Sequence, residues 1–288
     1  MATLRPTLRR MLPADVEAAT EMILRNDWGV RRDWLSFAAT QAACRPIVAE
    51  ADGVIVGTGV GTANGAVGWI GTIFLEPEWR GQGLGRALTQ AIIDQLEEAG
   101  CRTLVLVATQ DGRRLYEKMD FRVQTRYRIL EAPGLPTGSA GSTTAAAEGP
   151  VVRPFNPSDL DFLHALDRAA TGEDRRHALE RFAAPETAKV AVMPDGSLGG
   201  FVIRAPWGGG ATVARSPDAA TAIVTARRET SGPTGRVRVG ILAGNAAGAA
   251  KLVGLGFEQR WSAPRMIRGE PLHWHPSWIW GQFNHAMG

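Results

Sequence analysis

The chain has 288 residues, 44% apolar and 21% charged, which is typical of a globular protein of one large or two ordinary domains. Its 32 basic and 29 acidic residues form no dense basic run, so we expect no nucleic-acid partner. No apolar run reaches the roughly 18 residues that span a bilayer, and the first residues lack the apolar core of a signal peptide. The chain has only 2 cysteines, too few for a disulfide framework. We therefore expect a cytoplasmic protein with no membrane partner.

The first predicted helix follows Asp15, a residue type that favours helix N-caps. Beyond it, the stretch NDWGVRRDWLSF brings together two tryptophans and two arginines: Trp28, Arg31, Arg32 and Trp34. Guanidinium groups bind carboxylates with two parallel hydrogen bonds, and indole rings pack on apolar bodies. These four residues are our candidates for binding a substrate, and a partly packed, solvated helix pair is the alternative.

The next predicted elements are strands and a helix. Strand-like runs flank Asp52-Gly53, a dipeptide typical of hairpin turns. The apolar run WIGTIFL, Trp69 to Leu75, predicts a buried strand, and a second one is expected from Cys101 to Ala108. Between these strands, leucine or isoleucine recurs every four residues and predicts a helix that Gly100 ends: Leu84, Leu88, Ile92 and Leu96.

A glycine-rich loop, within PEWRGQGLGRAL, joins the first of these strands to the helix just after Arg80. Free N–H groups at a helix N-terminus and the helix dipole favour an anion, and glycines let a phosphate approach the backbone. The stretch lacks the Gly-Lys-Ser/Thr of a P-loop, and Arg86 stands where a dinucleotide fingerprint needs its third glycine. We therefore expect a pyrophosphate on the amides from Gly81 to Gly85, with a tight glycine turn as the alternative.

A stretch rich in Gly, Pro, Ser, Thr and Ala predicts a flexible linker over residues 131–150. The parts on either side, residues 1–130 and 151–288, carry similar signals at similar offsets, which indicates a duplicated unit. The paired signals are acidic residues before helices, Asp-Gly turns and a phenylalanine near each end: Asp15 and Asp159, Asp52 and Asp195, Phe121 and Phe257.

The first half resembles the GNAT acetyltransferase superfamily through Arg80-x-x-Gly83-x-Gly85, CRTLVLVAT and GRRLYEKMDF. The resemblance implies two α/β domains, each a mixed, mostly antiparallel sheet flanked by helices, with acetyl-CoA as co-substrate and no metal. It implies that the backbone of Phe74 and Leu75 pairs with the pantetheine arm where this strand parts from its neighbour, often at a β-bulge. The other coenzyme contacts that it implies are Arg80, Gly81, Gln82, Gly83, Leu84, Gly85 and Thr109.

Tyr116 occupies the general-acid position of the family, from which a phenol can protonate the leaving thiolate. A core tyrosine with a satisfied hydroxyl is the alternative. We assign no general base, because three carboxylates near the central strands are typical of surface residues: Glu50, Glu76 and Glu78. Two residues depart from the family pattern, Thr109 in place of an asparagine and Asp120 in place of a glycine, and the second suggests a differently shaped turn.

Residues 151–288 also resemble a GNAT-like domain, but they lack the glycine loop and the tyrosine. We interpret them as a degenerate copy that supports the acceptor site of a catalytic domain over residues 1–130. The chain is interpreted as an acetyl-CoA-dependent N-acetyltransferase that acts by direct transfer to a primary amine of a small molecule, amino acid or peptide. A non-catalytic acyl-CoA-binding regulator and an interaction protein that keeps only the fold are the alternatives, and a homodimer is left open.

Overall fold

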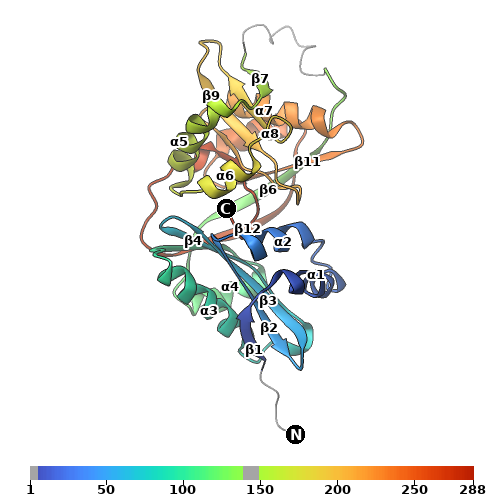
Figure 1. The fold of residues 1–288 in the computed structure, drawn as a ribbon. Coiled ribbons are helices and arrows are strands. Elements are labelled where there is room, and N and C mark those ends of the chain that lie inside the picture. The colour runs from blue at the N-terminus through green and yellow to red at the C-terminus, as the bar shows by residue number, and fades with distance from the viewer. Residues whose placement is uncertain (1–5, 139–148) are drawn as a thin grey trace. The chain divides into compact units, whose positions relative to one another are not determined.

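The computed structural model describes residues 6–138 and 149–288, which form two compact units (Figure 1). The first unit comprises Met1–Arg122, Met266–Pro271 and Asn284–Gly288, and the second comprises Val123–Arg265 and Leu272–Phe283. The predicted division of the chain at residues 131–150 is therefore wrong. The first boundary lies between Arg122 and Val123, and the chain passes between the units four times. None of the described helices combines the length and the apolar character that a bilayer crossing requires.

The first unit is built on a sheet with the strand order β1-β2-β3-β4-β5, followed by the end of β12. Neighbours from β1 to β4 are antiparallel, whereas β4 and β5 are parallel. Figure 1 shows α3 on one side of these strands and the pair α1 and α2 on the other. The elements of this unit are β1 (Thr7–Arg10), α1 (Val16–Arg25), α2 (Arg32–Thr40), β2 (Cys44–Ala51), β3 (Val54–Asn64), β4 (Val67–Leu75), α3 (Leu84–Glu98), β5 (Thr103–Val107) and α4 (Gln110–Glu117).

The local predictions for this unit are confirmed where the chain carries a clear signal. Asp52 (φ 49°) and Gly53 (φ 75°) form the tight turn between β2 and β3, and β4 covers the predicted buried strand. Helix α3 ends just before Gly100, which has a φ of 88°. Asp120 adopts a φ of 66°, the conformation that glycine favours, so the turn before Phe121 keeps its left-handed residue. The expectation of a differently shaped turn there is wrong.

Helix α3 packs closely on β3 because glycines occupy alternate positions of that strand. A Cβ atom on Gly59 would lie 2.6 Å from Cδ1 of Ile92, and one on Gly61 would lie 2.7 Å from Cγ2 of the same residue. Side chains alternate between the faces of a strand, so this face of β3 is bare backbone that accommodates the apolar stripe of α3. The stripe and the sheet together form the buried core that holds the start of α3 in place.

Two segments from the far end of the chain complete the first unit. The hydroxyl of Thr103, at the start of β5, donates a 2.9 Å hydrogen bond to the carbonyl of Glu270, and Met266 is fully buried in the core. The segment Asn284–Gly288 buries Ala286 and Met287, and its backbone carbonyls accept hydrogen bonds from β3. A strand's own residue pattern does not name its partner strand, so these long-range pairings lay beyond sequence reasoning.

The second unit has a five-stranded sheet of order β13-β10-β9-β8-β7, and a separate antiparallel pairing of β6 with β11. The earlier part of β12 lies beside β6. The elements are β6 (Arg122–Pro133), β7 (Val151–Pro154), α5 (Leu160–Thr171), α6 (Arg176–Phe182), β8 (Ala188–Val192), β9 (Leu198–Ile203), β10 (Thr212–Ala214), α7 (Pro217–Ser231), β11 (Arg236–Leu242), α8 (Ala246–Gly254), β12 (Glu258–Gly269) and β13 (Ile279–Gly281).

The duplication inferred from the sequence is visible in two matching ion pairs. Arg9 donates two hydrogen bonds of 2.7 and 2.8 Å to Asp15, and Arg153 donates two of the same lengths to Asp159. Both aspartates occupy the N-cap position of their α-helix, as predicted, but neither side chain makes a capping hydrogen bond to that helix. Each carboxylate instead accepts a backbone N–H three residues earlier, and so closes the 3-10 turn that precedes the α-helix.

The predicted linker begins too early. Residues 131–133 continue strand β6, where Glu131 accepts hydrogen bonds from Arg236 at 2.5 Å and from Arg238 at 2.8 Å. The hydrogen bonds and charges of these guanidiniums hold the pKa of Glu131 below its usual range. The composition of the stretch did not indicate that Glu131 belongs to a strand, because its partners Arg236 and Arg238 lie 105 and 107 positions further along the chain. Most of the remaining linker prediction, residues 139–148, lies outside the described residues.

Candidate active site

The strand β4 carries a β-bulge near its end. Thr58 of β3 faces Phe74, whereas Val60 faces Gly71, so Thr72 and Ile73 together oppose a single residue. Thr72 has a φ of 54°, a conformation that side chains bearing a Cβ branch rarely adopt. Its hydroxyl accepts a 3.0 Å hydrogen bond from the indole of Trp34, which fixes α2 to the bulge.

The two central parallel strands separate at this point. Residue pairs join β4 to β5 from Val67–Thr103 through Ile70–Leu106, and the pairing then ends. The bulge and the parting that the family resemblance implies are therefore both present. Among the described residues, β5 makes no further pairs with β4 beyond Ile70, which leaves the strand edge that a pantetheine arm would require.

The glycine loop forms an open turn at the start of α3. Gly81 (φ 74°) and Gly83 (φ 86°) take left-handed conformations, are exposed, and would have nothing within 4 Å of an added Cβ atom. Gly83 is the N-cap of α3 and has no side chain to satisfy the first amides of the helix. Leu84 buries its side chain in the core, so only its backbone is available to a ligand.

Arg80 lies back over the end of β4. Its Nε donates a 3.0 Å hydrogen bond to the carbonyl of Leu75, and its guanidinium lies 5.6 Å from the ring centre of Phe74. Gln82 is held in the loop by a 2.7 Å hydrogen bond from its side-chain amide to the carbonyl of Glu78. The loop thus presents one cation and the free N–H groups of a helix start on the same short stretch.

Tyr116 lies on α4 in the core of the first unit, with only 8% of its surface exposed. Burial raises the pKa of its phenol to about 12, so the hydroxyl is protonated at neutral pH. Its ring packs edge-on against Phe121 at 6.2 Å, and among the described residues its hydroxyl accepts or donates no hydrogen bond. Thr109 caps α4, because its hydroxyl accepts the N–H of Gly112 at 3.1 Å.

Of the four substrate candidates of the α1–α2 region, the two tryptophans both contact the end of β4, and Arg31 lies between them in the sequence. Trp28 packs edge-on against Phe74 at 5.4 Å and remains 39% exposed, whereas Trp34 is buried at the bulge. Arg31 is half-buried between them in the chain. Arg32 forms an ion pair with Glu17 on the surface, and we therefore leave it out of the proposed acceptor site.

Sequence reasoning missed His285, because its contact places it beside a bulge whose first residue, Thr72, lies 213 positions earlier (285 − 72). A Cβ atom on Gly71 would lie 2.7 Å from the carbonyl oxygen of His285 and 2.5 Å from the Cβ of Ala286. Desolvation, together with the charge of Arg31, lowers the pKa of His285 to about 4, so the imidazole is neutral at physiological pH. No local sequence pattern around His285 predicts its contact with Gly71.

The carboxylates considered as bases are engaged elsewhere or exposed. Glu76, at the end of β4, accepts hydrogen bonds of 2.6 Å from Arg25 and 2.8 Å from Asn26. Burial alone would raise its pKa, but these hydrogen bonds and the charge of Arg25 outweigh burial and lower it. Glu50 is paired with Arg9, and Glu78 is exposed, so no carboxylate is assigned as a general base.

Comparison with known families matches both halves of the chain. The Acetyltransferase (GNAT) family matches residues 9–121, and the Acetyltransferase (GNAT) domain matches residues 163–281. The chain belongs to the GNAT acetyltransferase family. The predictions of two GNAT domains and of mixed, mostly antiparallel sheets flanked by helices are thereby confirmed.

Relatives of this GNAT protein are N-acetyltransferases. The uncharacterized N-acetyltransferase YitH of Bacillus subtilis (strain 168) is 28% identical over 195 residues, with 66% of each chain covered. Aminoglycoside N(6′)-acetyltransferase type 1 of Stenotrophomonas maltophilia is 33% identical over 113 residues, which cover 34% of this chain and 72% of that protein. Glucosamine 6-phosphate N-acetyltransferase of Trypanosoma brucei brucei is 33% identical over 66 residues, and the match spans less than half of it, 45%.

Solved structures share the tandem arrangement. A candidate acetyltransferase from Pyrococcus horikoshii superposes with a TM-score of 0.81 at 20% identity, covering 100% of this chain and 98% of that one. A tandem GNAT protein from the clavulanic acid biosynthesis pathway gives a TM-score of 0.60 at 16% identity, covering 92% and 99%. At these identities the likeness concerns the fold alone.

The second GNAT unit lacks an open helix start. Its helix α7 begins with Pro217, which has no N–H, and the hydroxyl of Ser216 accepts the N–H of Ala219 at 3.2 Å. The corresponding start of α3 in the first unit has Gly83 and no side-chain cap. Helix α7 therefore offers fewer free amides at its start than α3 does.

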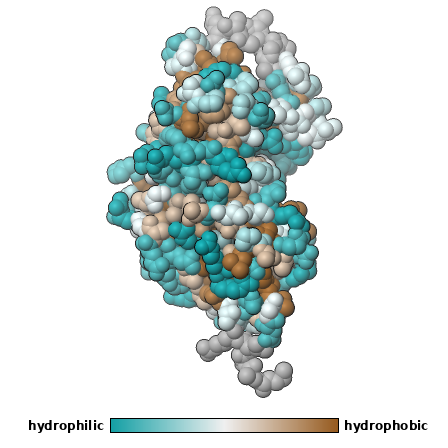
Figure 2. Space-filling view, in the orientation of Figure 1, coloured by the Kyte–Doolittle hydropathy of each residue, from teal (hydrophilic) through white to brown (hydrophobic). Residues whose placement is uncertain are grey.

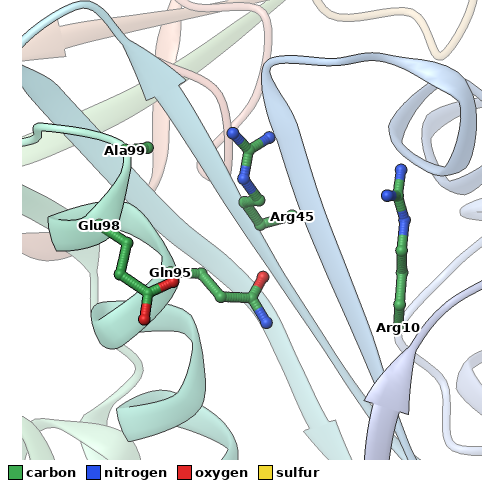
Figure 3. Close-up of a pocket in the computed structure, with 5 residues that line it drawn as sticks. All are labelled: Arg10, Arg45, Gln95, Glu98 and Ala99. Atoms are coloured by element: carbon green, nitrogen blue, oxygen red, sulfur yellow. The ribbon is translucent and has the colours of Figure 1, made fainter.

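One hollow of about 390 Å³ lies away from these features (Figure 3). It is lined by Arg10, Arg45, Gln95, Glu98 and Ala99. The α3 residues among them belong to the last turn of that helix, whereas the glycine loop precedes its first turn. The hollow is therefore not part of the site at the start of α3.

The face in Figure 2 is mainly hydrophilic, with small apolar patches. Among the described residues, no group of three or more metal-ligating side chains is present.

Proposed function

We propose that this chain is an acetyl-CoA-dependent N-acetyltransferase that transfers the acetyl group directly to a primary amine of a small molecule, amino acid or peptide. The observation that carries the proposal is the open N-terminus of α3 immediately after a bulged strand that has parted from its neighbour. A pyrophosphate and an extended arm need these two features, in this order. The named acceptors of the relatives, an aminoglycoside and glucosamine 6-phosphate, support a small amine.

In this proposal, the residues of the site divide into those that bind the coenzyme, those that position α4 and those that face the acceptor. The amides from Gly81 to Gly85 and the guanidinium of Arg80 bind the pyrophosphate, while the side chain of Gln82 shapes the loop. The backbone of Phe74 and Leu75 pairs with the pantetheine arm. Thr109 holds the start of α4 by its cap, and α4 carries Tyr116. Trp28, Arg31 and Trp34 lie on the acceptor side of β4.

At the carbonyl carbon, the reaction forms a C–N bond and breaks a C–S bond. The neutral amine nitrogen attacks the thioester carbonyl carbon, the C–S bond breaks, and the amine proton leaves to water. The thiolate takes a proton from the phenol of Tyr116, which burial keeps protonated, and the phenolate then takes a proton back from water. We assign the second unit a supporting role in acceptor binding, because it matches a GNAT domain while its helix α7 lacks the glycine-led, uncapped start of α3.

The proposal is tested by incubating the full chain with acetyl-CoA and a panel of amines, and by measuring the release of free thiol. Turnover that depends on an amine supports the transferase. Calorimetric binding of acetyl-CoA without turnover on any amine would favour the acyl-CoA-binding regulator, and the absence of coenzyme binding would contradict both.

A further inference from the structure

Arg31 is a half-buried cation that has no acidic partner in the part of the chain that the structure describes. Its Nη1 donates a 3.1 Å hydrogen bond to the carbonyl of Val30, and it forms no ion pair with any carboxylate of the described residues. Its neighbours in the same region are paired, Arg25 with Glu76 and Arg32 with Glu17. Arg31 is thus the one of these three guanidiniums that remains uncompensated.

The position of Arg31 is fixed from both sides. Trp28 packs on Phe74 at 5.4 Å, and the indole of Trp34 donates a 3.0 Å hydrogen bond to Thr72. Both contacts are with the end of β4, on and just after the bulge. The short stretch that carries Arg31 is therefore held beside the point where β4 parts from β5.

Within residues 6–138 and 149–288, the segment packed beside the bulge supplies no counter-ion for Arg31. The segment Asn284–Gly288 lies against Gly71 just before the bulge, and His285, its titratable side chain, is neutral at physiological pH. The positive charge of Arg31 contributes to that neutrality. A guanidinium that has lost part of its hydration is unfavourable without an anion, and desolvation lowers the pKa of Arg31.

We propose that Arg31 binds an anionic group of the acceptor, so that the preferred amine also carries a carboxylate or a phosphate. The inference rests on the proposed acetyl transfer and narrows its substrate class. A planar guanidinium binds either group through two charge-assisted hydrogen bonds, while Trp28 offers an apolar surface to the body of the acceptor.

The experiment uses amines that differ only in the anion. L-phenylalanine is compared with phenethylamine for the carboxylate, and glucosamine 6-phosphate with glucosamine for the phosphate. The full chain loaded with coenzyme A is titrated calorimetrically with each compound, and kcat/KM with acetyl-CoA is measured in parallel. The variants are Arg31→Gln, Arg31→Lys, and Arg32→Gln as a matched control that removes a neighbouring charge already paired with Glu17.

We expect the wild type to prefer at least one anionic amine over its neutral counterpart by roughly tenfold to a hundredfold, the effect of a hydrogen-bonded charge. Arg31→Gln should abolish the preference, Arg31→Lys should keep part of it, and Arg32→Gln should retain it. The pair that shows the preference identifies the anion as carboxylate or phosphate.

Two results overturn the inference: equal binding or no binding of both members of each pair, or a preference that survives in Arg31→Gln. Preferential binding of an anionic amine without any turnover would leave the anion site standing and contradict the proposed acetyl transfer. Turnover of neutral and anionic amines at equal kcat/KM would support the proposed acetyl transfer and contradict the anion site at Arg31. The two proposals can therefore fail separately.

Discussion

The hydroxyl of Thr62 donates a 2.8 Å hydrogen bond to the backbone carbonyl of Ala286, 224 positions further along the chain. Asn64, two residues on, donates a 2.9 Å hydrogen bond to the carbonyl of Met287. Through these contacts with β3, the segment Asn284–Gly288 becomes part of the unit that carries the candidate active site. Acceptor binding in the first unit should therefore depend on residues from the far end of the sequence.

The variant Thr62→Val tests this dependence. Valine keeps the shape of threonine but leaves the carbonyl of Ala286 without its donor, which should cost about 1–3 kcal/mol of unfolding free energy. We expect KM for the acceptor to rise while coenzyme affinity stays unchanged. Thr103→Val is the control, because it removes a similar 2.9 Å bond to Glu270 elsewhere in the same unit. An equal rise of the acceptor KM in both variants would contradict the specific role of the segment.

The variant Gly83→Ala should weaken acetyl-CoA binding by roughly tenfold or more, because a methyl group would occupy the open space in front of the first amides of α3. The control is Gly100→Ala, at the other end of the same helix. Gly83 and Gly100 have φ values of 86° and 88°, and neither has an atom within 4 Å of an added Cβ. Both variants should lose about 1–2 kcal/mol of stability, the cost of a left-handed alanine. Calorimetry that finds equal coenzyme affinity in the two variants would remove the basis of the phosphate site.

The variant Tyr116→Phe should lower kcat by about 10²–10⁴-fold with little change in coenzyme affinity, since the ring remains and the acidic proton is lost. Tyr127→Phe, which removes the buried phenol of the second unit, is the control and should leave kcat within about twofold. Steady-state kinetics with wild-type kcat in Tyr116→Phe would show that water or another group protonates the thiolate.

Much of the first unit could be predicted because its signals are local. An Asp-Gly turn, a stripe of apolar residues and a glycine before a helix each constrain a few neighbouring residues, and β2, β3, β4 and α3 follow from them. The path of β6 and the end of β12 could not be predicted, since each strand passes from one unit into the other. Alternation tells which face of a strand is buried but not which strand lies beside it.

In the candidate site, too, the features carried by consecutive residues could be predicted, and those that depend on tertiary contacts could not. The glycine loop and Tyr116 were identified from consecutive residues, whereas the contact of His285 with Gly71 joins positions far apart in the sequence. The ion pairs of Glu76 with Arg25 and of Arg32 with Glu17 are also tertiary features. Sequence reasoning could group the charged residues of α1 and α2, but it could not show which charges were compensated.

The pKa of His285 predicts a specific pH dependence of stability. Its folded value of about 4 lies below the ordinary 6.5, so the unfolded chain binds a proton first as the pH falls. The stabilising contribution is complete above pH 6.5 and is lost between 6.5 and 4. Between pH 7 and about 4.5, the wild type should lose roughly 1–3 kcal/mol more unfolding free energy than His285→Gln. Denaturant titrations that show parallel losses in the two proteins would contradict the burial of a neutral imidazole.

The final prediction is that the full chain binds one coenzyme A. The argument rests on the starts of the two corresponding helices. In α3 the N-cap is Gly83, which leaves the first amides free, whereas in α7 Pro217 lacks an N–H and Ser216 already accepts the N–H of Ala219. A pyrophosphate at α7 would have to displace this cap, which contributes about 1 kcal/mol, and would find fewer donors. Calorimetry of the full chain should therefore give a stoichiometry near 1, and Gly83→Ala should weaken that single event. Ser216→Gly removes the α7 cap but not the proline, so it should not create a second event. A second equivalent of coenzyme in the wild type, or binding unaffected by Gly83→Ala, would contradict the assignment of the site to the first unit alone.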